Sequence, residues 1–341
     1  MKRPTIADIA RQAGVSKVAV SYALNDQPGV SAQTRARVKA IAREVGWRPS
    51  NAARALNGAL ARAVGLAVCR PARTLGVEPF FMELISGIES ELAPRSIALM
   101  LQTVTSHDDE VELYQRWWGE GRVDGALLVD LHDDDTRVPA LAALDMPVVA
   151  LGPPHAAGTV PAVWSDDGAS IRETVAYLAT LGHRSIARVA GLARLAHTTV
   201  RDAAFEASCR EAGLPEPAVV HTDYSGEDGA QATRRLLIAP SPPTAIVYDN
   251  DIMAVAGLSV AQELNLEVPR DLSLVAWDDS PFTQAVRPQL TALTRDIFDY
   301  GACAARTLLA AVDKEPVEHL QVTAARLVPR ASTSPPQPRL R

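Results

Sequence analysis

The chain has 341 residues, of which 47% are hydrophobic, enough apolar material for two or three domains with their own cores. Its three cysteines are far apart without CxxC spacing, which argues against a disulfide-rich or zinc-binding protein. The charged N-terminus has no signal-peptide core and no apolar run could span a membrane, which argues against a secreted or membrane protein. We therefore expect a soluble, cytoplasmic protein. The net charge of −6 divides into +7 for residues 1–60 and −13 for the rest, the asymmetry expected of a nucleic-acid-binding module joined to a different kind of domain.

The first predicted elements are two short helices joined by a turn. Apolar residues recur at helical spacing over residues 6–13, and Thr5 can cap that helix. Gly14 then breaks the pattern, and Ser16 can cap a second helix. This arrangement is typical of a helix-turn-helix, whose second helix offers its outward face to the major groove. The residues on that face are Lys17, Val18, Ser21, Tyr22 and Asn25.

A third helix and a much shorter fourth one are expected next. Ser31 can cap the third helix, and Gly46 ends it. The fourth helix, at about residues 50–57, has fewer than two turns before Gly58. Because nucleating a helix is costly, such a short one needs a partner, either a second subunit or DNA.

From residue 64 onward, short apolar runs alternate with helical patterns in two similar series. This alternation predicts an α/β fold with parallel sheets, helices on both faces and ligand sites at the carboxyl ends of the strands. Expected strands are 64–69, 97–102, 125–130, 147–151, 162–165, 186–190, 219–221, 245–248 and 274–277; expected helices are 81–92, 108–119, 139–144, 169–181, 199–212, 228–237, 251–264 and 298–312.

Several stretches carry a resemblance to one protein family. Residues 9–16 (IARQAGVS) and 49–56 (PSNAARAL), with the spacing kept between them, resemble the DNA-binding headpiece of the lactose/galactose repressor (LacI/GalR-type) family of bacterial transcriptional regulators. Residues 122–125 (RVDG), 181–187 (LGHRSIA) and 250–254 (NDIMA) resemble its periplasmic-binding-protein-like effector domain. The other reading of the N-terminal segment is a three-helix bundle that binds nothing.

The resemblance implies an all-α helix-turn-helix headpiece followed by a two-lobed effector domain with parallel sheets. The chain is then expected to cross between the lobes near 158–163, 288–292 and 318–322. The Pro-rich tail is expected to be disordered. The implied parts are a headpiece at 1–58 with its hinge helix at about 50–57, an effector-binding and dimerisation domain at 59–330 (lobe 1 at about 61–160 and 292–318, lobe 2 at about 163–288 and 321–330), and a tail at 331–341.

The headpiece resemblance assigns residues to double-stranded operator DNA. Lys17, Val18 and Tyr22 are expected to read bases, because Lys reaches guanine acceptors and Val touches a thymine methyl. Many family members have Arg at the position of Tyr22, so the operator sequence is expected to differ. The remaining DNA-binding candidates hold the backbone or belong to the hinge: Thr5, Ser16, Ser21, Asn25, Arg35 and Arg54.

Leu56 resembles the family's hinge leucine, which enters the minor groove at the centre of a palindrome as an apolar wedge. The alternative is that Leu56 packs against the effector domain. The wedge is favoured because residues 52–56 match the family as a unit.

The body resemblance assigns an effector site to the cleft. Arg201 matches the family's effector-binding arginine, and an arginine with a carboxylate can hydrogen-bond sugar hydroxyls while aromatic rings cover the apolar face. Gly152 stands where several sugar-binding members have an acid. The same arginine would bind a purine or a carboxylate in other members, and the alternative is an Arg201–Asp278 salt bridge in an unused cleft. The effector-binding candidates are Phe80, Phe81, Trp164, Arg201, Asn250 and Asp278.

The predicted function is a ligand-responsive transcriptional repressor that binds a palindromic operator as a homodimer, without cofactor or metal. The acidic run at 133–135 is expected to be a solvated loop, and His183 and His197 are expected to be structural or to lie at the pocket rim. A protein partner in place of the small molecule is the alternative; nucleotide-binding, hydrolase and zinc-protease motifs are missing from the sequence, which opposes an enzyme. The headpiece opposes a transport-linked binding protein. Whether ligand weakens or strengthens operator binding stays open.

Overall fold

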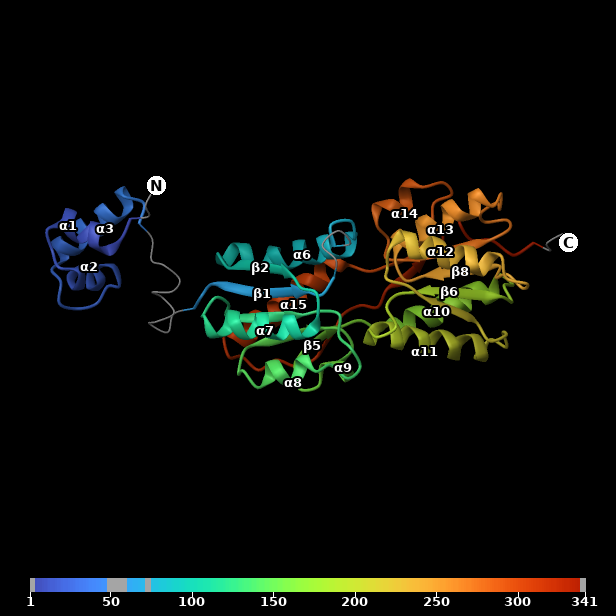
Figure 1. Ribbon diagram of the computed structural model, residues 1–341, viewed down its shortest axis with the longest axis horizontal. Helices are drawn as coiled ribbons and strands as arrows, with labels where there is room; N and C mark the ends of the chain where they lie inside the picture. The colour runs from blue at the N-terminus through green and yellow to red at the C-terminus, as the bar shows by residue number, and fades with distance from the viewer. Residues whose placement is uncertain (1–3, 48–59, 71–74, 338–341) are drawn as a thin grey trace. The chain divides into compact units, whose positions relative to one another are not determined.

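The computed structural model describes residues 4–47, 60–70 and 75–337. The chain forms two compact units, residues 1–61 and 62–341 (Figure 1). The expected hinge helix at about 50–57, with Arg54 and Leu56, lies outside the described residues. No helix within the described ranges is long and apolar enough to cross a membrane.

The N-terminal unit consists of α1 (Ile6–Ala13), α2 (Lys17–Leu24) and α3 (Ala32–Glu44). Each helix begins at a side-chain cap, since Thr5 makes a capping box with Asp8, Ser16 accepts from the backbone of Ala19, and Ser31 accepts from that of Thr34. Small and branched apolar residues from all three helices fill one core. The buried members are Ile9, Ala10, Ala13, Val20, Ala23, Val38 and Ala42.

The first lobe of the C-terminal unit is a parallel sheet covered by helices on both faces. Its strand order is β11-β5-β4-β3-β1-β2. Helices α6 (Pro79–Leu92) and α15 (Ile297–Val312) cover one face, while α7 (His107–Gly119), α8 (Arg137–Ala142) and α9 (Pro154–Ala157) cover the other. The strands are β1 (Ala63–Val68), β2 (Ala98–Thr103), β3 (Gly125–Leu128), β4 (Val148–Leu151), β5 (Ala162–Trp164) and β11 (Leu320–Gln321).

The second lobe repeats this topology with the order β12-β10-β9-β8-β6-β7, in which only β12 is antiparallel to its neighbour. Helices α12 (Gly226–Leu237) and α13 (Asp251–Glu263) cover one face, and α10 (Asp167–Thr180) and α11 (Ala196–Glu211) cover the other. The short α14 (Pro281–Ala285) follows β9. The strands are β6 (Ile186–Ala190), β7 (Ala218–His221), β8 (Ala245–Tyr248), β9 (Ser273–Trp277), β10 (Thr291–Thr294) and β12 (Arg326–Val328).

The chain crosses between the lobes three times, each time slightly later than the sequence predicts. The crossings lie between β5 and α10 (residues 164–167), between β10 and α15 (294–297) and between β11 and β12 (321–326). Residues 292–294, expected in the first lobe, therefore pair in the second sheet. The later two crossings follow β10 and β11, strands of four and two residues that are too short for sequence periodicity to reveal.

The expectation of a disordered tail is wrong for residues 331–337. Ser332 is fully buried, where its hydroxyl accepts from the backbone N–H of Thr291 (2.8 Å) and donates to the carbonyl of Leu274 (2.6 Å). The Leu274 N–H in turn donates to the Ser332 carbonyl (2.9 Å). Composition indicated disorder, but specific hydrogen bonds at the sheet edge fix this segment.

The expectation of a solvated loop at 133–135 is wrong for Asp135, which belongs to a buried ionic network. Arg137 donates from Nη1 to Glu110 (2.7 Å) and from Nη2 to Asp135 (2.6 Å), and the exposed fractions of the three side chains are 1%, 0% and 0%. Burial raises the pKa of Glu110 to about 7, although Arg137 favours its charged form. The network ties α7 to the loop before α8.

Candidate functional site

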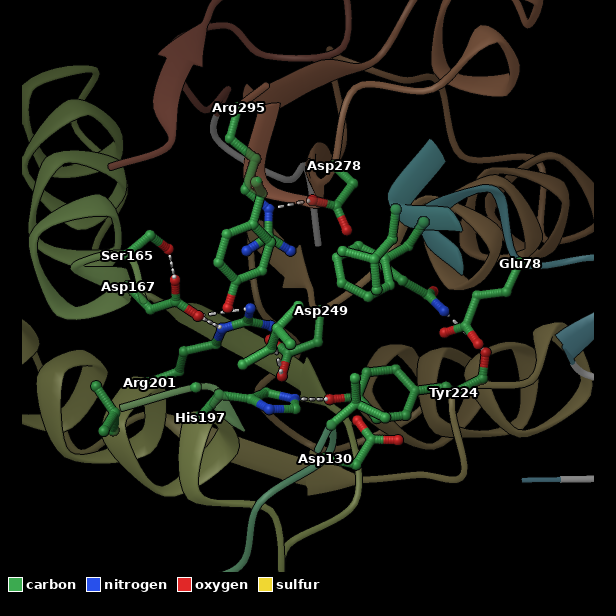
Figure 2. Close-up of a pocket in the computed structure, with 18 of the residues that line it drawn as sticks. Glu78, Asp130, Ser165, Asp167, His197, Arg201, Tyr224, Asp249, Asp278 and Arg295 are labelled. Carbon is green, nitrogen blue, oxygen red and sulfur yellow. Dashed lines mark hydrogen bonds and ion pairs between the residues drawn. The ribbon is translucent and has the colours of Figure 1, made fainter. Parts of the chain in front are cut away.

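A cleft between the two lobes collects polar side chains that follow the carboxyl ends of strands in both sheets. It encloses about 880 Å³ free of protein atoms, part of it open to solvent. Figure 2 shows Arg201, Asp167 and Ser165 on one side of this pocket and Glu78 on the other. Its polar lining consists of Arg70, Glu78, Asp130, Ser165, Asp167, His197, Arg201, Tyr224, Asp249, Asn250, Asp251, Asp278 and Arg295.

Arg201 is the centre of the second-lobe side. Its Nε donates to Oδ2 of Asp167 (2.8 Å), and Nη2 forms an ion pair with the same oxygen at 2.7 Å. Its guanidinium carbon lies 3.6 Å from the centroid of the Trp277 ring. Burial opposes ionisation of Asp167, but the charges of Arg201 and Arg295 and the hydrogen bond from Ser165 together outweigh it and lower the pKa of that carboxyl. The expected alternative, an Arg201–Asp278 salt bridge, is not formed, because Arg295 binds Asp278 instead (Nε to Oδ1, 3.0 Å).

Asn250 lines the cleft as predicted, but its side chain already has protein partners. Its Oδ1 accepts from the Met253 N–H (2.8 Å), which caps α13, and its Nδ2 donates to the Tyr224 carbonyl (2.9 Å). Asn250 therefore positions the loop that carries Tyr224. The residue before it, Asp249, accepts two hydrogen bonds from Arg188 (2.8 and 2.7 Å).

On the first-lobe side, Arg70 follows β1 and pairs with Asp130, which follows β3. Nε and Nη2 of Arg70 donate to the two carboxylate oxygens at 2.9 and 3.1 Å. Burial opposes ionisation of Asp130, but Arg70 outweighs it and lowers the pKa to about 2. Burial and neighbouring carboxylates raise the pKa of Glu78 to about 7, against the attraction of Arg70.

The backbone is strained at three positions around the cleft. Asp130, Tyr224 and Asp278 have φ angles of 53°, 70° and 65°, which non-glycine residues rarely adopt. Salt bridges hold the two aspartates, and the Tyr224 ring passes so close to Gly191 that a Cβ there would clash. Strain of this kind concentrates at binding sites, where the fold fixes side chains in advance.

His197 and Tyr224 are neighbouring residues in the lining of the pocket. Its Nε2 lies 2.8 Å from the Tyr224 hydroxyl, and burial together with Arg201 lowers its pKa to about 4. The imidazole is therefore neutral near pH 7. Among the described residues, no three His, Cys, Asp or Glu side chains lie together as metal ligands would.

Of the three aromatic residues predicted to contact the effector, one lines the cleft and two do not. Phe80 lines the cleft, whereas Phe81 packs in the first-lobe core and Trp164, at the end of β5, does not line it. Sequence reasoning missed Arg70, Glu78, Asp130, Asp167, Tyr224, Asp249 and Arg295, although a polar residue directly after a buried strand was a usable signal for several of them.

The N-terminal unit presents the predicted DNA-reading face. Val18 and Tyr22 on α2 are 60% and 40% exposed, and Lys17 is exposed beside them. An apolar side chain so exposed indicates a contact surface. Ser16 and Asn25 mark the two ends of α2, with Ser21 half-buried between them.

Two other predicted DNA contacts have partners within the unit. Thr5 is the N-cap of α1. Arg35 donates to the Gln27 carbonyl (2.7 Å) and to Asp26 (3.4 Å), so it also holds the loop between α2 and α3.

The chain is similar to known proteins over nearly its whole length. Residues 5–50 match the model of bacterial regulatory proteins of the lacI family, and residues 175–333 match a periplasmic binding protein-like domain. Catabolite control protein A of Priestia megaterium is 30% identical over 318 residues, 92% of this chain and 94% of that protein.

Two solved structures extend the comparison. The CelR–cellobiose complex is 29% identical with a TM-score of 0.72, covering 97% of this chain and all of that one. The lac repressor dimer bound to operator and the anti-inducer ONPF is 25% identical with a TM-score of 0.83, covering 98% of this chain and all of that one. A helix-turn-helix unit followed by a two-lobed binding domain with a polar cleft defines a DNA-binding transcriptional regulator. The chain belongs to the lacI family of bacterial regulatory proteins.

Proposed function

We propose that the protein is a cytoplasmic repressor that binds a palindromic operator as a homodimer and is controlled by a carbohydrate in the interlobe cleft. The observation that carries the proposal is the cleft itself, where charged side chains and the rings of Phe80 and Tyr300 line one pocket. Paired polar groups and aromatic surfaces suit sugars. The cellobiose in the CelR complex supports this class of ligand.

The proposed switch is a change in lobe arrangement. A ligand alters DNA binding only if it binds one arrangement better than the other. The first strand of the body, β1, begins at residue 63, directly after the N-terminal unit, so a lobe rotation would change the spacing of two hinge segments in a dimer.

Control by a protein partner is the second candidate, and catalysis is not part of the proposal. Titration of neutral sugars into the full-length chain, followed by calorimetry, separates the two. Heat of binding on addition of a sugar, together with a changed affinity for the operator, supports control by a carbohydrate. Operator affinity that changes only on addition of a protein would support control by a protein partner instead.

We expect Lys17→Ala and Tyr22→Ala to relax base preference at particular operator positions, by about 1–3 kcal/mol each, because they would remove contacts to base edges. Arg35→Ala should weaken all sequences alike, since phosphate contacts carry no sequence information. Selection of binding sites from a random DNA library measures this. Identical consensus sites for wild type and both α2 variants would contradict the assignment.

We expect Leu56→Ala to weaken operator binding by a few kcal/mol at most, because the wedge and its bend are lost together. Binding to random DNA, which rests on phosphate contacts, should hardly change. Fluorescence anisotropy on both DNAs tests the difference. Equal losses on operator and random DNA would remove Leu56 from the minor groove.

A further inference from the structure

Glu78 and Arg70, both from the first lobe, line the cleft close to each other without forming a hydrogen bond. Nη1 of Arg70 lies 3.8 Å from Oε1 of Glu78, too far for one, and the two side chains are only 6% and 7% exposed. In the part of the chain that the structure describes, Nη1 of Arg70 and Oε2 of Glu78 have no hydrogen-bond partner. Leaving a buried donor and a buried acceptor unpaired costs free energy, and both belong to residues that line the pocket, so a ligand group that pairs with both would remove this cost.

The open donor of Arg70 is held in place by the rest of its side chain. Nε and Nη2 are fixed by Asp130. The guanidinium carbon lies 4.7 Å from the ring centroid of Tyr224 and 5.6 Å from that of Phe81. Tyr224 follows β7 of the second lobe, while Arg70 follows β1 of the first, so this place in the cleft is bounded by both lobes.

The two open atoms require a group that both accepts and donates. A hydroxyl accepts from Nη1 of Arg70 and donates to Oε2 of Glu78. An ammonium group would face the guanidinium of Arg70, and a phosphate or carboxylate would face Glu78. We propose that Glu78 and Arg70 form a second polar subsite of the cleft that binds a hydroxyl group of an uncharged carbohydrate. The proposal rests on the proposed function and specifies its ligand.

The charge of the whole cleft agrees with an uncharged ligand. Each arginine that lines it already has a carboxylate partner, since Arg70 binds Asp130, Arg201 binds Asp167 and Arg295 binds Asp278. Six carboxylates line the cleft against these three guanidinium groups, and Arg188 behind Asp249 adds a fourth. An anion would find no guanidinium among these four without a carboxylate partner, and would meet an excess of negative charge.

The first experiment measures ligand class by calorimetry on the full-length protein. The probes are glucose, galactose, maltose and cellobiose, each beside charged counterparts: glucose 6-phosphate, galactose 6-phosphate, glucuronate, galacturonate and glucosamine. We expect an uncharged sugar to bind at least tenfold more tightly than any charged one. A charged probe that binds as tightly overturns the subsite while leaving a carbohydrate effector in place. Absence of binding by every probe refutes the carbohydrate effector and the subsite with it.

The second experiment locates the hydroxyl on Glu78. At pH 8, where Glu78 with its pKa of about 7 is mostly ionised, Glu78→Ala should weaken affinity for the sugar that binds roughly ten- to a hundredfold, the effect of losing a hydrogen bond to a charged group. Glu112→Ala, at an exposed glutamate on α7, is the matched control and should leave affinity unchanged. Glu78→Gln keeps the size of the side chain and replaces the alanine variant in this experiment if that variant does not fold. The glutamine variant should weaken sugar binding several-fold.

Monodeoxy derivatives of the same sugar complete the test. The derivative that lacks the hydroxyl bound by Glu78 should bind the wild type more weakly than the parent sugar does. The Glu78→Ala variant (or Glu78→Gln) should bind this derivative and the parent sugar with nearly equal affinity. Wild-type affinity in a folded Glu78 variant, or equal deoxy penalties with and without Glu78, overturns the proposal.

Discussion

Replacement of Arg137 by Met is expected to lower the free energy of unfolding of the C-terminal unit by about 3–5 kcal/mol. The variant leaves Glu110 and Asp135 buried without their shared cation, and neither side chain has more than 1% of its surface exposed. Urea denaturation at pH 8 measures the loss. We choose that pH because Glu110, with its pKa raised to about 7, is mostly ionised there.

The loss should shrink at lower pH. In the wild type Glu110 takes up a proton below about pH 7, which weakens its ion pair with Arg137, so the variant has less to lose there. Without Arg137, which lowers the pKa of Glu110, the carboxyl in the variant stays protonated to higher pH. Arg116→Met, at an exposed position of α7, is the control and should change stability by less than about 0.5 kcal/mol. A loss below about 1 kcal/mol at pH 8 would show that the network contributes little to the fold.

Arg201→Ala is expected to move the midpoint of the ligand response to a ligand concentration about ten- to a hundredfold higher, because the substitution removes a charged hydrogen-bond donor proposed to bind the ligand. Affinity for operator without ligand should stay near wild type, since Arg201 lies in the cleft between the lobes and not in the N-terminal unit. Operator affinity across a titration with the sugar identified by calorimetry measures both. A folded variant that responds at the wild-type midpoint would remove Arg201 from the site.

The structure adds a condition to that experiment. Arg201 also neutralises Asp167 and stacks on Trp277, so its removal leaves a buried carboxylate unpaired and lowers stability. Thermal melting of the variant must therefore accompany the titration. Arg210→Ala, exposed near the end of the same helix α11, is the control for both measurements.

The sequence anticipated where the cleft lies better than what its side chains do. The family resemblance assigned Asn250 and Asp278 to the cleft, and both line the pocket. Their contacts were not predictable, because Asn250 uses its amide on Tyr224 and Asp278 binds Arg295, which follows β10, a strand absent from the sequence prediction. Whether these residues bind an effector stays a prediction.

The sequence alone determined most of the elements and their alternation. The helix caps at Thr5, Ser16 and Ser31 and the apolar runs from β1 to β9 are local signals, and a local signal acts within a few residues. The family could be inferred for the same reason, since its motifs are contiguous.

Only the tertiary structure decided which charges meet. Arg70 and Asp130 lie 60 residues apart, and Arg188 and Asp249 lie 61 apart, brought together by neighbouring parallel strands. Ion pairing depends on the distance between two side chains and on their burial, and no repeating pattern in the sequence reports either quantity for residues so far apart. The burial of the tail at Ser332 and the open acceptor of Glu78 likewise arise from packing between distant segments.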